Sequence, residues 1–262
     1  MKTSRTIAET RSAIGSADDI GLVPTMGALH AGHLALLEAA RDECEFVVAT
    51  IFVNPAQFGP GEDYERYPRD EEADAEAAAQ AGVDLLFVPA VEEMYPEGFR
   101  TWVEVDDTGG HEAEARPGHF RGVATICLKL FNVIRPTRAY FGQKDARQIA
   151  VIRQLVRDLN LDLEIRVVPT VRDPDGLAVS SRNAYLSPSE REQALALPRA
   201  LAAGAAAYRQ GKSAVEAARA SMNGLQVDYI AEEIDGEERM LEAAVRVGRT
   251  RLIDNVILEG DS

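Results

Sequence analysis

Short apolar runs alternate with longer segments of helical period through the first half of this chain. The apolar runs are IGLVPT (20–25), FVVATIFV (46–53) and VDLLFVP (83–89), and the segments between them include LALLEAARDE (34–43) and DEEADAEAAAQAG (70–82). Each apolar run is too short for a helix and fits a strand that is buried on both faces. Repeated strand–helix–strand units predict a parallel sheet with helices on both sides.

The middle of the chain continues this pattern up to about residue 168. Two further helices are expected there, over residues 120–133 and 145–158. Two further short strands are expected over residues 139–141 and 163–168.

The composition changes in the last third of the chain. The stretch 187–224 is rich in Ala and Arg and begins with the helix-start signal Ser187-Pro188-Ser189-Glu190. Runs that favour strands follow, with a turn expected at Asp235-Gly236. The sequence therefore predicts an α/β protein, with a Rossmann-like parallel-sheet domain over residues 1–174 and a smaller α+β domain over residues 175–262.

The charge balance limits the partners that this chain can bind. Its 28 basic and 43 acidic residues give a formal net charge of −15, and they include no basic block. Such a chain attracts a nucleic-acid backbone poorly, so we expect no nucleic-acid partner. No apolar run approaches the roughly 20 residues of a membrane span, and the first residues lack the apolar stretch of a signal peptide. We therefore expect no membrane association and a cytoplasmic location. Cys44 and Cys127 each lie in an apolar stretch, so we expect both to be reduced and buried.

Residues 24–33, PTMGALHAGH, carry the most informative pattern for function. They follow a predicted buried strand and lead directly into a predicted helix. Ligands bind at this edge of a parallel sheet, and a helix start offers N–H groups and partial positive charge to phosphate. His30 and His33 can donate hydrogen bonds to phosphoryl oxygens without a permanent charge, and Gly27 and Gly32 allow a nucleotide to approach the backbone closely. A solvated helix start and a zinc site are the alternatives. Because few further zinc ligands are available, we expect no protein-bound metal.

His-Ala-Gly-His after a strand resembles the signature of the HIGH-motif nucleotidyltransferase superfamily, which includes the class I tRNA synthetases. Six stretches narrow the resemblance to the pantothenate synthetase (pantoate–β-alanine ligase) family: PTMGALHAGH (24–33), IFVNPAQF (51–58), RPGHFRGV (116–123), FGQKDARQ (141–148), DGLAVSSRN (175–183) and GRTRLIDN (248–255). This resemblance implies an ATP-dependent acid–amine ligase. The family commonly has Glu where Gln143 stands, Gln or a similar residue where Arg147 stands, and Met or Thr where Ala56 stands.

The resemblance implies an ATP site built from three parts of the chain. These are the turn and helix start (Met26, Gly27, Ala28, Leu29, His30, Ala31, Gly32, His33), a strand-to-helix junction (Gly142, Gln143, Lys144, Asp145) and a later loop (Val171, Val179, Ser180, Ser181, Arg182). The Lys144 ammonium can neutralise phosphate charge, the Asp145 carboxylate can accept hydrogen bonds from ribose, and the Arg182 guanidinium suits bidentate phosphate contact. The catalytic residues are expected to be His30, His33, Lys144, Ser181 and Arg182.

Gln57 and Gln148 are expected to hold pantoate, as the matching glutamines do in the family. A neutral amide can orient a hydroxyl or a carboxylate while the carboxylate oxygen stays nucleophilic. Met26 and Phe52 can supply an apolar wall for the paired methyl groups of pantoate. Three basic residues lie close together in the sequence: Arg116, His119 and Arg121. They can steer anionic substrates into the site, or they can simply belong to a loop that caps the start of a helix.

The reaction that the resemblance implies has two half-reactions. The pantoate carboxylate attacks the α-phosphorus of ATP and expels pyrophosphate, which leaves an enzyme-held pantoyl adenylate; the amine of β-alanine then attacks the activated carbonyl and AMP leaves. Mg²⁺ is expected to arrive with ATP, bound mainly by phosphate oxygens and water. The family also implies a homodimer. Two other functions stay open here: a nucleotidyltransferase that acts on a phosphate acceptor, and a non-catalytic ATP-sensing module.

Overall fold

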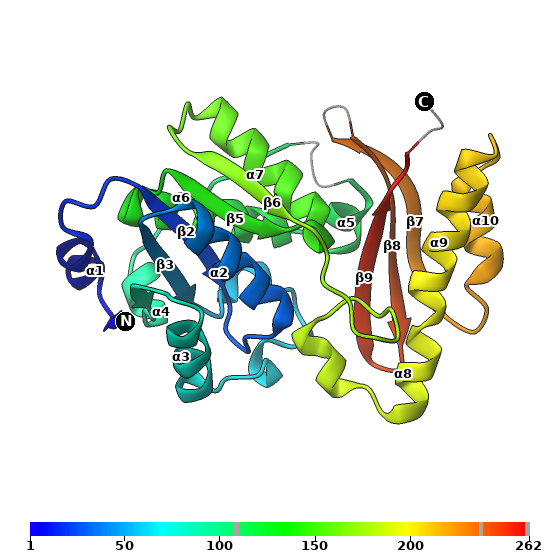
Figure 1. Ribbon diagram of the computed structural model, residues 1–262, viewed down its shortest axis with the longest axis horizontal. Helices are drawn as coiled ribbons and strands as arrows, with labels where there is room; N and C mark the ends of the chain where they lie inside the picture. Colours follow the sequence, from blue (N-terminus) through cyan, green and yellow to red (C-terminus); the bar gives the residue numbers. More distant parts are fainter. Residues whose placement is uncertain (107–109, 236–237, 260–262) are drawn as a thin grey trace.

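The structure, a computed structural model, describes residues 1–106, 110–235 and 238–259, and within these residues the strands form two sheets (Figure 1). The first sheet has the spatial order β1-β4-β3-β2-β5-β6, and all its neighbouring strands are parallel. The strand bounds are β1 Lys2–Ser4, β2 Ile20–Thr25, β3 Phe46–Ile51, β4 Leu85–Phe87, β5 Arg138–Gly142 and β6 Glu164–Val168. The predicted parallel sheet is therefore confirmed, with β1 as an additional edge strand.

Helices cover both faces of the parallel sheet. On one face, α2 (Ala31–Glu43) and α3 (Glu71–Gln80) pack against the strands, and Val47 and Leu86 belong to the buried cluster there. The neighbouring strand residues Val48 and Leu85 point to the opposite face, because side chains alternate along a strand. The helices that cover this second face are α1 (Ile7–Ile14), α6 (His119–Ile134) and α7 (Ala146–Asp158).

Short helical segments connect these layers. They are α4 (Val91–Met94), α5 (Gly110–Ala115), η1 (Pro55–Gln57), η2 (Tyr64–Arg66), η3 (Gln143–Asp145) and η4 (Ser181–Tyr185).

The strand order reverses between β2 and β5. From β2 the sheet continues outward through β3, and from β5 it continues in the opposite direction through β6. In open parallel sheets, a ligand crevice forms at the carboxyl ends of the strands where the order reverses. Residues 26–33 follow β2 and residues 142–145 lie at the end of β5, so two segments of the predicted ATP site flank this reversal.

The second sheet is antiparallel and consists of β7 (Gln226–Asp235), β8 (Glu238–Val247) and β9 (Thr250–Ile257). Its outer face is covered by α9 (Ala196–Arg209) and α10 (Ala214–Ser221), and its other face is turned toward the parallel sheet (Figure 1).

The helix-start signal in the sequence is confirmed. Ser187 precedes α8 (Pro188–Ala194) and forms a capping box with Glu190. The fold class is also confirmed, whereas the boundary between residues 174 and 175 stays a prediction. Gly236 of the expected turn lies outside the described residues. Among the residues that are described, no helix is long and apolar enough to cross a membrane.

Candidate active site

A cavity of about 970 Å³ lies between the carboxyl ends of the parallel strands and the second sheet. The predicted site residues that line it are Met26, His30, Gly32, His33, Gln57, Gly142, Lys144, Asp145, Gln148, Val171, Val179, Ser180, Ser181 and Arg182. The predicted ATP-binding residues that do not line it are Gly27, Ala28, Leu29, Ala31 and Gln143. The chain therefore brings the two imidazoles, the ammonium and the guanidinium to one cavity, while their contacts with ATP stay predictions.

A buried carboxylate holds the turn after β2. The backbone N–H groups of Ala28 and Leu29 donate to Asp74 of α3 at 2.8 and 2.6 Å. Gly27 has a φ of 83°, and a Cβ at this position would lie 2.8 Å from Oδ2 of Asp74. Glycine is therefore needed at position 27 both for its backbone conformation and for this close approach. The N–H groups of Ala28 and Leu29 are thus engaged by Asp74, and neither residue lines the cavity.

The same turn presents two imidazoles to the cavity. The rings of His30 and His33 stack with their centroids 4.0 Å apart. Burial and, to a smaller extent, the positive charge of Lys144 lower the pKa of His30 to about 4. Burial, followed by the neighbouring His30 and Lys144, lowers the pKa of His33 to about 3. Within the described residues, Nδ1 of each ring is buried and has no hydrogen-bond partner. Both rings are therefore neutral near pH 7, and both residues line the cavity.

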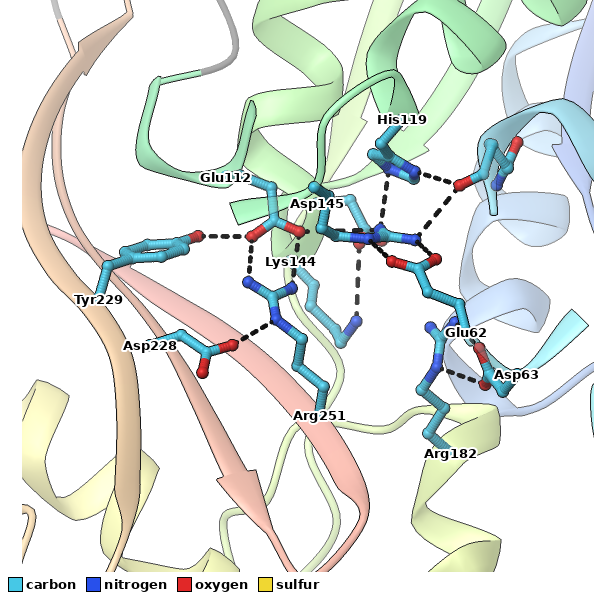
Figure 2. Close-up of polar contacts among 12 residues, drawn as sticks. Glu62, Asp63, Glu112, His119, Lys144, Asp145, Arg182, Asp228, Tyr229 and Arg251 are labelled. Carbon is cyan, nitrogen blue, oxygen red and sulfur yellow. Dashed lines mark hydrogen bonds and ion pairs between the residues drawn. The ribbon is translucent and has the colours of Figure 1, made fainter. Parts of the chain in front are cut away.

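Lys144 reaches the cavity from η3, between β5 and α7. Its Nζ lies 3.7 Å from Oδ1 of Asp145, and the Asp145 side chain is 46% exposed (Figure 2). An ion pair at this distance with an exposed partner contributes little free energy. The ammonium can therefore exchange this carboxylate for a phosphate at little cost.

Arg182 is bound to a carboxylate that we did not anticipate. Its Nε and Nη2 donate to the two oxygens of Asp63 at 2.9 and 3.0 Å (Figure 2). Burial alone would lower the pKa of Arg182, but the hydrogen bonds and the charge of Asp63 outweigh this effect and raise it. The neighbouring Ser181 hydroxyl lies 3.2 Å from the hydroxyl of Tyr67. A phosphate that used the Arg182 fork would have to replace Asp63.

A buried asparagine orients Gln57. Nδ2 of Asn54 donates to Oε1 of Gln57 at 3.0 Å and to the carbonyl of Gly122 at 3.1 Å. Asn54 is 1% exposed, and its Oδ1 accepts a hydrogen bond from the Tyr95 hydroxyl at 2.8 Å. Because Oε1 of Gln57 is engaged, its Nε2 remains for a ligand, and it lies 3.2 Å from the sulfur of Met26. Sequence reasoning did not predict a role for Asn54, although this residue lies in IFVNPAQF (51–58), one of the stretches that carry the family resemblance.

The basic residues near position 118 already have partners. Arg116 donates to both oxygens of Glu62 at 2.8 and 2.6 Å. Burial raises the pKa of Glu62, but the hydrogen bonds and charge of Arg116 outweigh it and lower this pKa to about 2. His119 Nδ1 donates to the carbonyl of Gln57 at 2.7 Å, and burial lowers the His119 pKa to about 4. Arg121 lies over the ring of Trp102 and does not line the cavity, so of its two alternative roles the geometry does not favour steering.

Ion pairs connect this wall of the cavity to the second sheet (Figure 2). Arg251 of β9 donates to both oxygens of Glu112 of α5, each at 2.7 Å, and to Asp228 of β7 at 2.8 Å. Arg147 of α7 donates to Glu242 of β8 at 3.0 Å, and both of these side chains are less than a tenth exposed. The position where the family commonly has Gln thus holds a buried ion pair between the two sheets.

Residues 2–257 match the family model described as pantoate-beta-alanine ligase. The chain belongs to the pantoate–β-alanine ligase family. It is 51% identical to a pantothenate synthetase of Chloroflexus aurantiacus, over 100% of this chain and 99% of that protein. It is also 51% identical to a pantothenate synthetase of Thermus thermophilus, over 98% of this chain and 99% of that protein. The family resemblance seen in the sequence is confirmed.

Solved structures in this family share the whole architecture. A crystal structure of pantothenate synthetase from Thermus thermophilus superposes with a TM-score of 0.94 at 49% identity and covers 98% of this chain and 99% of its own. A pantoate–β-alanine ligase from Francisella tularensis, complexed with beta-gamma ATP and β-alanine, has a TM-score of 0.86 at 34% identity and covers 98% of this chain and 97% of its own. The similarity includes both sheets and therefore the cavity walls that each of them supplies.

Proposed function

We propose that this chain is an ATP-dependent ligase that condenses pantoate with β-alanine to form pantothenate, with release of AMP and pyrophosphate. One observation carries the proposal: two neutral imidazoles, an ammonium, a guanidinium and two side-chain amides all line one cavity. The cationic groups suit a triphosphate, and the amides suit a hydroxy acid whose carboxylate must stay reactive.

In the first half-reaction, an oxygen of the pantoate carboxylate attacks the α-phosphorus of ATP, and the bond to the bridging oxygen breaks to release pyrophosphate. Lys144 and Arg182 offset the negative charge that develops on the phosphate oxygens. His30 and His33 donate hydrogen bonds to the same oxygens, and as neutral rings they carry no charge that must be buried. Ser181 donates a further hydrogen bond.

Gln57 and Gln148 hold pantoate in position for this attack. The orientation of Gln57, with Oε1 bound to Asn54, leaves its Nε2 to donate to a pantoate oxygen. An amide donor weakens the nucleophile less than a bidentate guanidinium would, because it adds no full charge beside the attacking oxygen.

In the second half-reaction, the amine of β-alanine attacks the acyl carbon of pantoyl adenylate, and the bond from this carbon to the AMP oxygen breaks. The adenylate reacts with water if it is exposed, so the site has to exclude water until the amine arrives. The position of the cavity between two sheets suits this task.

Mg²⁺ enters, on this proposal, as part of the ATP substrate. In the part of the chain that the structure describes, His, Cys, Asp and Glu side chains form no group of three or more that could hold a metal ion. Phosphate oxygens and water are therefore the natural ligands, as is usual for Mg²⁺ with nucleotides.

A homodimer and a cytoplasmic location are further proposals that rest on the family and the sequence. Sedimentation of the purified chain at a mass of twice 28.5 kDa would support the dimer, and a single-chain mass would refute it. Fractionation of cells that produce the chain tests its location.

The activity assay uses ATP and pantoate, with and without β-alanine, and follows pyrophosphate and AMP separately. The proposal predicts pyrophosphate with pantoate alone and sustained AMP release only when β-alanine is added. A nucleotidyltransferase that acts on a phosphate acceptor would show no effect of the amine on AMP release. A non-catalytic ATP-sensing module would bind ATP and yield no pyrophosphate.

A further inference from the structure

Two adjacent polar residues of β9 contact two segments of the predicted ATP site. Asp254 and Asn255 are 2% and 3% exposed, although they lie on a strand of the second sheet. The side-chain Nδ2 of Asn255 donates to the backbone carbonyls of Gln143 and Lys144 at 2.8 and 3.0 Å. Its Oδ1 accepts a hydrogen bond from the Gln143 side chain at 3.3 Å. One amide thus holds the backbone of η3, from which the Lys144 ammonium extends.

Asp254 holds the segment that leads to Ser181 and Arg182. Its carboxylate accepts two hydrogen bonds from Arg172 at 2.7 and 3.0 Å. The same guanidinium donates to the carbonyl of Gly176 at 3.2 Å, inside the loop that precedes η4. A third hydrogen bond, from the backbone N–H of Asn255 to Asp254 at 2.8 Å, fixes the carboxylate relative to the neighbouring amide.

We infer that Asp254 and Asn255 are positioning residues for phosphate activation, and that Asn255 sets the position of Lys144 through the backbone of η3. This inference rests on the proposed function, because it assumes that Lys144 contacts the triphosphate. Asn255 does not line the cavity and acts through the groups it holds; Asp254 lines the cavity, and both of its carboxylate oxygens are engaged by Arg172. The second sheet thus determines the geometry of a cation that belongs to the first sheet.

The chemistry of an asparagine fits this role better than that of its near relatives. Two carbonyl oxygens need a donor that can serve both, and an amide nitrogen carries two hydrogens. An aspartate of the same shape would place a carboxylate beside these carbonyls, where it could only repel them. Loss of the donor would also leave two carbonyl oxygens without this partner beside a buried position, so η3 would no longer be held in place.

The test is a double-mutant cycle that measures the steady-state rate of pyrophosphate release with ATP, pantoate and β-alanine for wild type, Asn255→Ala, Lys144→Ala and the double variant. We expect Asn255→Ala to lower kcat by about 10²-fold, the usual consequence of moving a catalytic group by about 1 Å. If Asn255 acts through Lys144, adding Asn255→Ala to Lys144→Ala lowers kcat by less than about twofold. An equal fold-loss in both backgrounds would overturn the inference, because it would mean that Asn255 only supports the fold.

Val256→Ala is the matched control, since Val256 neighbours Asn255 on β9 and packs against the buried cluster of the second sheet. It should lower the melting temperature and leave kcat near the wild-type value. If Asn255→Ala does not fold, Asn255→Ser replaces it in the test, because the serine hydroxyl keeps one hydrogen-bond donor on a shorter side chain. The kcat of Asn255→Ser should lie between those of wild type and Lys144→Ala. A kcat for Asn255→Ser or Asn255→Ala equal to that of Val256→Ala would overturn the inference.

The cycle also separates this inference from the proposed function. A wild-type chain that releases no pyrophosphate with pantoate would contradict the proposed function itself. A wild-type chain that does release it, together with an Asn255→Ala variant of equal kcat, would contradict only the positioning role of β9.

Discussion

Gly122→Ala tests whether the position of Gln57 determines the use of pantoate. Gly122 lies in α6, and a Cβ there would be 2.3 Å from the carbonyl oxygen of Ala56 and 2.6 Å from the backbone nitrogen of Gln57. Because unbonded atoms need about 3.5 Å, α6 and η1 must separate by roughly 1 Å. A shift of this size in a group that orients substrate costs about 10²-fold in rate.

We expect kcat/KM for pantoate to fall by about 10²-fold in Gly122→Ala when pyrophosphate release is followed at saturating ATP. The KM for ATP should change little, because the predicted ATP segments do not include η1. Overpacking should also lower the free energy of unfolding by about 1–3 kcal/mol, measured by denaturant titration.

Gly204→Ala is a control with a similar steric conflict at a different place. A Cβ at position 204 would lie 2.4 Å from Cδ2 of Leu241 and 2.9 Å from the carbonyl oxygen of Ala214, in the core of the second sheet. This variant should also lose stability, by less than Gly122→Ala because the Leu241 side chain can shift, and should keep its kcat/KM for pantoate. Equal losses of kcat/KM in the two variants would refute the reasoning, since the loss would then follow stability and not the position of Gln57.

Three further predictions concern the turn after β2 and the ammonium opposite it. NMR titration should show His30 and His33 taking up protons near pH 4 and 3, well below 6.5. Since unfolded histidines protonate near pH 6.5, the free energy of unfolding should fall as the pH drops below about 6.5; midpoints near 6.5 in the folded chain would contradict this. Asp74→Ala should lower the free energy of unfolding by about 1–3 kcal/mol for each of the two N–H groups it leaves unpaired, and Asp74→Asn, which keeps an acceptor oxygen, should lower it less. Lys144→Ala should depress pyrophosphate release by about 10²-fold or more, and an unchanged rate would remove Lys144 from the mechanism.

The parallel sheet could be predicted because its central strands are buried on both faces. β2 and β3 therefore stand out as continuous apolar runs between amphipathic segments. β1 could not be predicted in this way. Its sequence, Lys-Thr-Ser, has no apolar residue, and the strand pairs only along one edge with β4. Strand formation there depends on backbone hydrogen bonds, which leave no pattern in the side chains.

The cationic groups of the site could be predicted from the sequence, but their partners could not. Asp63 precedes its partner Arg182 by 119 residues, and Glu112 precedes Arg251 by 139 residues. Spacing along the chain indicates neighbours on one helix or strand, whereas these pairs depend on how separate elements pack. The same holds for Asp74, whose place near the turn after β2 is set by the packing of α3.

The central claim is that His30, His33, Lys144 and Arg182 act on one triphosphate, and a crystal structure with a non-hydrolysable ATP analogue and pantoate tests it most directly. We predict that all four side chains lie within about 3 Å of the same triphosphate and that Arg182 has exchanged Asp63 for phosphate oxygens. A triphosphate bound outside the cavity, or a bound analogue with Arg182 still paired to Asp63, would contradict the claim.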